Sequence, residues 1–273
     1  MQPNGIITLT TDFGATDSYV GSMKGVILSI APQARLIDIT HEIGPQDTHQ
    51  AAYVVQTFYS YFPPGTIHLV IVDPGVGSTR RAIALGTPEA TFVAPDNGVL
   101  TYVWRDALDR FGAGACQVHE LAEPRFWLAN ISNTFHGRDL FAPTVAHLAG
   151  GVPIQALGPR LAALTEADLE QPSQSRNGGL AGRIIHVDHF GNCITNITPA
   201  HLEQAGLSER LVVRIIDQRI AGLGRTFADA PVGALIALIG SNNRLELAVR
   251  NGSAAQTLGV GIGDTVRVDP AAS

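Results

Sequence analysis

The sequence predicts an α/β protein in two parts. We expect a mostly parallel, Rossmann-like sheet with flanking helices in the first half and a smaller, antiparallel, barrel-like β-domain in the second. In the first half, β-rich runs alternate with helical stretches long enough to serve as crossover helices, which is typical of parallel sheets. In the second half, short runs rich in Val and Ile follow each other closely between Gly and Pro residues, which is typical of antiparallel barrels and sandwiches.

The elements of the first half follow from this alternation. Strands are predicted at residues 6–10, 36–39, 67–72, 82–85, 91–94 and 117–121, and helices at 18–30, 48–62 and 139–149. The first helix is followed by "AP", the second by "PP" and the third by "GG". Pro lacks a backbone donor and Gly permits a turn, so both residue types end helices.

The second half begins after a polar segment. Because "TEADLEQPSQSRNGG" has no apolar period and carries turn residues, we predict a domain at 1–160, a linker at 161–178 and a domain at 179–273. Strands are predicted at 180–187, 193–197, 211–216, 234–239, 245–249 and 265–268, with a single helix at 199–205.

Composition excludes several classes of partner. The net charge of −6 does not suit a nucleic-acid partner, because neutralising phosphates requires clustered Lys and Arg. Cys116 and Cys193 are too few for a disulfide framework and favour a reducing compartment. The start "MQPNGIITLT" has no secretory pattern, and no apolar run reaches the ~20 residues of a membrane helix. We therefore expect a cytoplasmic protein that binds neither nucleic acid nor membranes.

Polar side chains follow three of the predicted strands in the first half. Asp12 follows the first strand, Asp73 the third, and Asp96 and Asn97 a later one. Any one of them could be a helix cap or an Asx-turn, but ligands of open parallel sheets bind beyond the carboxyl ends of the strands, so three together predict a site. No glycine-rich dinucleotide fingerprint is present, and carboxylates suit a cation, a metal or ribose hydroxyls.

The segment "IVDPGVGSTRRAIAL" reads as a strand, a glycine turn and a second strand, and it returns Arg80 toward Asp73. It lacks the Gly-Lys-Ser/Thr ending of a phosphate-binding loop, so a structural ion pair and a catalytic pair are both consistent with it. His136, in "NTFHGRDLF", precedes the third predicted helix. It could be a cap, a surface histidine or a site residue.

A metal site is the alternative reading of "HVDHFGN". His186, Asp188 and His189 are residue types that bind metals at short spacing. On a strand, however, His186 and Asp188 would share a face and His189 would point away. No H-E-x-x-H motif is present, and we expect no bound metal.

Six segments, in order, resemble one known family. "TTDFG" with "DSYVGSMKG", "VDPGVGSTRR", "APDNGVLT", "NTFHGRD", "VDHFGNCITN" and "LELAV" are similar to the S-adenosyl-L-methionine (SAM) hydroxide adenosyltransferases, adenosine-forming hydrolases related to fluorinase and chlorinase. The resemblance covers nearly the whole chain. It implies an N-terminal α/β domain, a C-terminal β-barrel, no cofactor, and a homotrimer with active sites at subunit interfaces. The implied reaction is hydrolysis of SAM to adenosine and methionine.

The resemblance also implies which residues form the site. Catalytic roles fall on Asp73, Arg80 and His136, and substrate-binding roles on Asp12, Asp73, Asp188, Asn192, Phe227, Ser241, Glu246 and Val249. In these positions Asp12 would bind the ribose, Asp188 the methionine ammonium group, and Asn192 with Phe227 the adenine. The general base stays open between Asp73 and His136. The group that binds the methionine carboxylate also stays open, because Asn242 stands where the halogenases have arginine.

Two other functions stay open. A non-catalytic adenosine or SAM binder would keep the adenosine-binding residues without needing the three catalytic residues together. A metal-dependent hydrolase would use the cluster around His186 and lose activity in a chelator.

Overall fold

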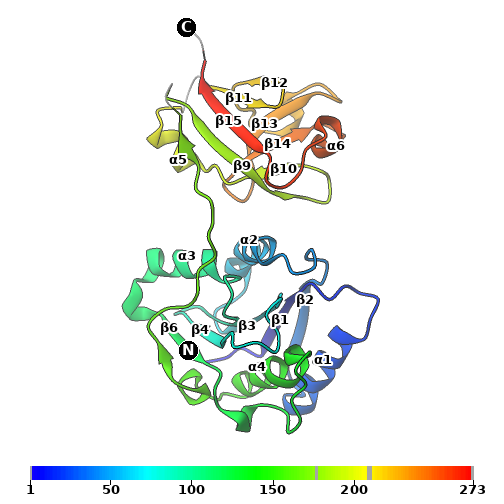
Figure 1. Cartoon of the computed structure of the whole chain (residues 1–273), viewed down its shortest axis with the longest axis vertical. Coiled ribbons are helices and arrows are strands. Elements are labelled where there is room, and N and C mark those ends of the chain that lie inside the picture. Colours follow the sequence, from blue (N-terminus) through cyan, green and yellow to red (C-terminus); the bar gives the residue numbers. More distant parts are fainter. Residues whose placement is uncertain (1, 176–177, 208–210, 272–273) are drawn as a thin grey trace. The chain divides into compact units, whose positions relative to one another are not determined.

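The computed structural model describes residues 2–175, 178–207 and 211–271 (Figure 1). The chain divides into two compact units, Met1–Asp168 and Leu169–Ser273. Each unit has its own sheet, with two hydrophobic cores in the first unit and a main core of its own in the second. No helix in the described ranges is long and apolar enough to cross a membrane.

The first unit is built on a seven-stranded mixed sheet with the order β2-β1-β3-β5-β4-β6-β7. Four neighbouring strands are parallel: β2 (Arg35–Thr40), β1 (Ile6–Thr11), β3 (Thr66–Ile71) and β5 (Ala90–Pro95). Three antiparallel strands extend it: β4 (Ala82–Gly86), β6 (Gln117–Glu120) and β7 (Arg160–Leu161). The parallel part contains the strands that the predicted crossover helices connect.

Helices cover both faces of this sheet. The α-helices are α1 (Tyr19–Ile30), α2 (Thr48–Phe58), α3 (Thr101–Phe111) and α4 (Ala142–Ala149). A π-helix, η4 (Gly137–Phe141), leads into α4, and short 3₁₀ turns lie at Tyr59–Tyr61, Ala113–Ala115, Pro124–Phe126 and Ile154–Leu157. Figure 1 shows α1 and α4 on one side of the sheet and α2 and α3 on the other.

Alternation along β3 explains why the unit has two cores. Leu69 and Ile71 pack with residues of α1 and α4, whereas Val70 and Val72 pack with residues of α2 and α3. Successive side chains of a strand point to opposite faces, so a continuous apolar run is buried on both sides of a covered sheet.

Three helices of this unit differ from the sequence prediction. The helix expected at 139–149 begins as the π-helix η4 at Gly137 and becomes α-helical only at Ala142. The helix expected at 48–62 ends at Phe58 and continues as a 3₁₀ turn. The helix α3 is absent from the sequence prediction, although Val103, Trp104 and Ala107 in "TYVWRDALDRF" recur at helical spacing and are buried. Its buried side chains, among them Val103 and Trp104, pack into the second core, and this tertiary contact stabilises the helix.

The second unit is an antiparallel, nearly closed barrel with the path β12-β11-β15-β9-β10-β14-β13. Its strands are β8 (Ser173–Gln174), β9 (Leu180–Val187), β10 (Cys193–Thr195), β11 (Leu211–Ile215), β12 (Gln218–Ala221), β13 (Leu235–Ile239), β14 (Leu245–Val249) and β15 (Thr265–Pro270). The helices are α5 (Pro199–Gln204), the 3₁₀ turn η6 (Phe227–Asp229) and α6 (Ala254–Leu258). A bridge between Gly224 and Leu238 links the two ends of the path. A Cβ on Gly224 would lie 2.5 Å from Ile236 Cδ1, so the Ile236 side chain would have to move to admit a larger residue.

The segment predicted as a linker, 161–178, contributes to both sheets. Leu161 pairs with Val118 of β6, and Ser173 pairs with Ala181 of β9. Residues 176 and 177 lie outside the described residues. The polar sequence of this segment did not reveal pairing, because edge strands of two residues have no apolar period to detect.

Candidate active site

The three polar strand ends lie at one edge of the first sheet, as predicted, because β1, β3 and β5 are neighbouring parallel strands. The structure divides them into two roles. Asp96 is buried, and its carboxylate accepts hydrogen bonds from Arg81 Nε at 2.8 Å and from Thr165 N at 2.6 Å. Asn97 Nδ2 donates to Val72 O at 2.9 Å. The side chains of Asp96 and Asn97 therefore stabilise this edge of the sheet. Asp12 and Asp73 remain as the candidates for binding a ligand.

Arg80 links Asp73 to His136. Its Nε donates to Asp73 Oδ1 at 2.8 Å, and its Nη2 contacts both Asp73 Oδ2 and His136 Nδ1, the latter at 3.0 Å. The guanidinium also lies over the ring of Phe141, with Cζ 5.4 Å from the centroid. The side chains of Arg80 and Asp73 are only 11% and 6% exposed, so this bidentate pair is largely removed from water. The glycine turn after Asp73 thus brings the guanidinium of Arg80 back to the Asp73 carboxylate. The same guanidinium also contacts the imidazole of His136.

The π-helix η4 places His136 beside Arg80. His136 is its N-cap residue, and π-helices are rare elements that occur frequently at functional sites. The buried carboxylate of η4, Asp139, accepts hydrogen bonds from Ser132 N at 2.7 Å and from Arg138 Nε at 2.6 Å. Although burial opposes it, these hydrogen bonds and the charge of Arg138 lower the pKa of Asp139. Asp139 stays ionised and anchors the segment that carries His136.

Gly77 allows the loop of Arg80 to contact the loop of His136. It has a φ of +76°, and a Cβ at this position would lie 2.4 Å from the backbone oxygen of Asn133. Only glycine combines this left-handed conformation with so close an approach. The contact brings the turn between Asp73 and Arg80 against the segment that precedes His136.

Gly77→Ala is therefore expected to destabilise the fold and to slow the reaction. The positive φ alone costs roughly 1–2 kcal/mol for a residue with a Cβ, and the contact with Asn133 adds to it. Displacing the loop of a candidate catalytic residue by about 1 Å should lower kcat on the order of 10²-fold. Gly259→Ala is the matched control, since Gly259 is left-handed with a φ of +65° and has no atom within 4 Å of its added Cβ. The control should lose stability without losing kcat, and equal kcat values for the two variants would contradict this role of Gly77.

Arg80 fixes the protonation state of His136. A guanidinium has only donors, so Nδ1 of His136 must accept the hydrogen bond from Arg80, and the ring proton lies on Nε2. Burial and the charge of Arg80 lower the pKa of His136, against the opposing charges of Asp73 and Asp139. The site therefore holds a neutral imidazole that presents an N–H donor.

Asp12 lies next to an aromatic cluster at the same edge. Phe13, Tyr19 and Phe135 contact one another with ring centroids 5.1 to 5.9 Å apart, and Tyr19 is 47% exposed. The Asp12 carboxylate accepts one hydrogen bond through Oδ2, from Gln46 N at 2.8 Å. The first unit thus offers a carboxylate and an exposed aromatic surface beside the catalytic candidates.

The second unit contains a cavity of about 660 Å³ that is lined by several of the predicted substrate-binding residues. Its lining includes Asn192, Phe227 and Val249, together with Phe190, Thr226, Ala228, Arg250, Asn251 and Gly252. Phe190 and Phe227 are 73% and 45% exposed, so both rings are available for stacking. An aromatic face with an amide and backbone groups nearby suits a flat heterocycle with a polar edge.

Asp188 organises the loop that carries Asn192. Its Oδ1 accepts from Phe190 N and Asn192 N, both at 2.9 Å, and its Oδ2 accepts from Asn192 Nδ2 at 2.9 Å. A carboxylate has about four acceptor positions, so one remains on Oδ2 for a ligand. Burial and the charge of Asp188 raise the pKa of Glu246 on β14. Ser241 is exposed in the turn between β13 and β14 and is not part of the cavity lining.

The alternative metal cluster is not assembled. The strand β9 ends at Val187, where the strand prediction also ended, so Asp188 and His189 lie in the following turn and not on a strand face with His186. Asp188 holds backbone and amide groups of that turn, and the His189 ring packs on Phe190. Within the described ranges, no group of three His, Cys, Asp or Glu side chains could hold a metal ion.

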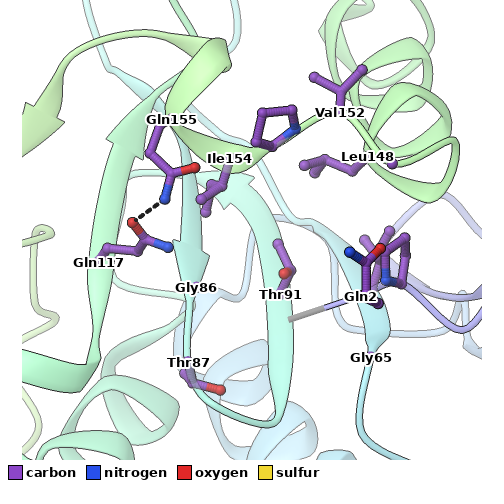
Figure 2. A pocket seen from close by; sticks show the side chains of 14 residues that line it. Gln2, Gly65, Gly86, Thr87, Thr91, Gln117, Leu148, Val152, Ile154 and Gln155 are labelled. Atoms are coloured by element: carbon purple, nitrogen blue, oxygen red, sulfur yellow. Dashed lines mark hydrogen bonds between the residues drawn. The ribbon is translucent and has the colours of Figure 1, made fainter.

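A further cavity of about 190 Å³ in the first unit lies away from the catalytic candidates (Figure 2). It is formed at the starts of β3 and β5, near Ile67 and Thr91, whereas Asp73 follows the other end of β3. Figure 2 shows the hydrogen bond from Gln155 to Gln117 across its wall, at 2.8 Å. The lining has no charged side chain, so this cavity offers no acid–base group.

Comparison with known proteins identifies the family. The model for the "SAM hydroxide adenosyltransferase N-terminal domain" matches residues 7–158, and the model for the C-terminal domain of the same family matches residues 182–267. The chain belongs to the SAM hydroxide adenosyltransferase family. The family resemblance of the six sequence segments is thereby confirmed.

Individual members of the SAM hydroxide adenosyltransferase family and its relatives match nearly the whole chain. An (R)-S-adenosyl-L-methionine hydrolase of Salinispora arenicola is 40% identical over 263 residues, which cover 96% of this chain and 97% of that protein. A fluorinase of Nocardia brasiliensis is 30% identical over 294 residues, 96% of each protein. The crystal structure of an uncharacterized conserved protein from Thermotoga maritima matches with a TM-score of 0.87 at 37% identity, covering 96% of this chain and 99% of that one. The predicted fold class is confirmed.

Sequence reasoning missed several groups at this site. Phe141 lies under the guanidinium of Arg80, and Tyr19 extends the aromatic cluster, but both appear in the sequence as ordinary apolar positions of helices. His41 and Gln46 contact the segment of Asp12 from a loop far along the chain. The left-handed conformation of Gln46, with a φ of +67°, has no sequence signal because Gln rarely adopts it.

Proposed function

We propose that this chain hydrolyses SAM to adenosine and methionine, with Asp73, Arg80 and His136 as its catalytic residues. The observation that carries the proposal is the hydrogen-bonded group in which Arg80 joins a buried carboxylate to a neutral imidazole. Family membership and the full-length similarity to proteins named (R)-S-adenosyl-L-methionine hydrolases support the choice of substrate.

The difficult part of the reaction is the activation of the nucleophile, a water molecule. The water oxygen forms a bond to C5′ of SAM, the C5′–S bond breaks, and its electron pair returns to sulfur, so methionine leaves as a neutral thioether. One water proton must be transferred to a base. No general acid is needed, because the sulfonium is already a good leaving group.

We assign the proton acceptor to Asp73. The Nδ1 lone pair of His136 is occupied by Arg80, and its Nε2 carries a proton, so this tautomer cannot accept one. Each Asp73 oxygen keeps a second lone pair after binding Arg80. Arg80 stabilises the developing hydroxide charge, and the Nε2–H of His136 orients the water. Because Asp73 neutralises Arg80, the group does not repel the cationic substrate.

Substrate binding is assigned to both units. Asp12 binds the 2′- and 3′-hydroxyls of the ribose, while Asn192, Phe227 and the backbone near Val249 bind adenine. Ser241 and Glu246, in the adjoining strand pair, are assigned to the adenine site. The remaining acceptor position of Asp188 binds the methionine ammonium group. The cavity around Phe227 and the hydrogen bonds of Asp188 support these roles.

We extend the proposal to a homotrimer in which each site combines the first unit of one subunit with the second unit of a neighbour. Exposed aromatic side chains in each half, Tyr19 in the first and Phe190 and Phe227 in the second, support such burial against substrate or partner. A head-to-tail contact must close on itself, and a three-fold ring is one such closure. A cytoplasmic location is part of the proposal and agrees with two buried, free cysteines, Cys116 and Cys193.

The activity is expected to fall in acid as His136 becomes protonated. Its pKa is below the ordinary value of 6.5, so turnover is complete above that pH and is lost as pH falls through the lower pKa of the folded protein. Protonation removes the acceptor of Arg80 and places a second cation beside it. The profile of kcat against pH tests this in His136→Asn, which keeps an acceptor near Nδ1 but does not titrate. His147→Asn is the control, since burial lowers the pKa of His147 on α4 as well. An acid limb that stays unchanged in His136→Asn contradicts the assignment.

Chromatography of SAM incubated with the pure protein tests the function, with and without a chelator. Formation of adenosine and methionine in equal amounts, at the same rate in chelator, supports the proposal. Loss of activity in chelator supports the metal-dependent alternative. Binding of adenosine or SAM without turnover supports the non-catalytic binder.

A further inference from the structure

A loop between β2 and α2 holds the strand end that carries Asp12. In this 41–47 loop, His41 Nδ1 lies 2.8 Å from the hydroxyl of Thr11, the last residue of β1. Further along the same loop, Gln46 N donates to Asp12 Oδ2 at 2.8 Å. The loop therefore contacts the residue before the carboxylate and the carboxylate itself.

On the side of its ring away from Thr11, His41 contacts Asp38, which pairs with Lys24. Its Nε2 lies 3.0 Å from Asp38 Oδ1, and the other oxygen of Asp38 lies 2.5 Å from Lys24 Nζ of α1. Although burial opposes it, the hydrogen bonds and charges of Lys24 and His41 lower the pKa of Asp38, so this carboxylate stays ionised. The backbone oxygen of His41 also accepts from Gly14 N at 2.8 Å. The His41 side chain is 12% exposed, and β2 and α1 fix it in place.

We propose that His41 is a positioning residue for ribose recognition, which acts by fixing the strand end so that Asp12 keeps one oxygen on Gln46 N and presents the other to the ribose hydroxyls. This inference rests on the proposed role of Asp12. A carboxylate whose orientation is set before binding loses less conformational entropy when the ligand arrives. The ring contacts both neighbours, with Nδ1 2.8 Å from the Thr11 hydroxyl and Nε2 3.0 Å from Asp38 Oδ1.

The test compares binding of adenosine and 2′-deoxyadenosine to the full chain. We expect the unsubstituted protein to prefer adenosine by about tenfold or more, the weight of one charge-assisted hydrogen bond. His41→Ala should lose most of this preference and raise KM for SAM more than it lowers kcat. His41→Asn, which keeps an acceptor near Nδ1, should recover part of it. His49→Ala is the matched control, because His49 is exposed on the neighbouring helix α2 and should leave both constants unchanged.

A double-mutant cycle separates positioning from a general loss of stability. If His41 acts through Asp12, adding His41→Ala to Asp12→Asn should cause no further loss of preference. Thermal unfolding of each variant shows that it is folded at the assay temperature, and His41→Asn carries the test if His41→Ala is not. Full retention of the preference in folded His41→Ala, or in His41→Asn where His41→Ala is not folded, overturns the inference alone, as do additive losses in the cycle. Retention of the preference in Asp12→Asn instead removes the ribose role of Asp12, on which the inference rests.

Discussion

Replacing Arg80 by lysine is expected to lower kcat on the order of 10²–10³-fold while changing the dissociation constant of adenosine little. Arg80 uses Nε and Nη2 to contact both oxygens of Asp73 and Nδ1 of His136 at the same time. A lysine has one nitrogen and cannot reproduce this planar fork, so the carboxylate, imidazole and water lose their mutual alignment. Steady-state kinetics with SAM and titration with adenosine measure the two effects separately.

Arg81→Lys is the control for this experiment. Arg81 is the next residue and also pairs with a buried strand-end carboxylate, that of Asp96, but its side chain is 41% exposed and it does not contact His136. We expect its kcat to be unchanged. Arg80→Ala is a poorer test, because it would leave the nearly buried Asp73 without a partner and cost about 3–5 kcal/mol of stability. Equal kcat values for Arg80→Lys and Arg81→Lys would remove Arg80 from the mechanism.

Mixing two inactive variants is expected to restore activity if active sites are shared between subunits. His136→Ala damages the catalytic group of the first unit, and Asn192→Ala damages the cavity of the second. After partial dissociation and reassociation, some sites in mixed oligomers would combine an intact first unit with an intact second unit. Because each parent retains almost no turnover, even a minority of such sites should give SAM hydrolysis well above that of either parent.

The mixture distinguishes two kinds of assembly. Native mass spectrometry of differently tagged subunits shows whether exchange has taken place and gives the number of subunits. The control mixes His136→Ala with Arg80→Lys, which damage the same unit and should not complement each other. If exchange is complete and the first mixture stays as inactive as its parents, each site is built within one chain, and the shared-site proposal is wrong.

The sequence alone was sufficient for the fold class and for the location of the candidate site. Hydrophobic periodicity is a local property, so it predicted the parallel strands, their crossover helices and the antiparallel second half. Strand ends are also local, and the rule that ligands bind beyond them placed Asp12 and Asp73 at one edge before their neighbours were known. The ordered segments around Asp73, Arg80 and His136 were specific enough to indicate the family.

Only the tertiary structure decided which polar groups belong together and what each one does. Asp96 and Asp73 look alike in the sequence, yet Asp96 holds the sheet edge while Asp73 contacts Arg80 and, through it, His136. The approach of His136 depends on Gly77 touching Asn133, and the setting of Asp12 depends on Gln46 in a left-handed conformation. The residues that make these contacts are far apart in the sequence but lie within a few ångströms of each other in the folded protein. Local propensity and periodicity carry no information about them, because they are set by how the loops pack once the sheet has formed.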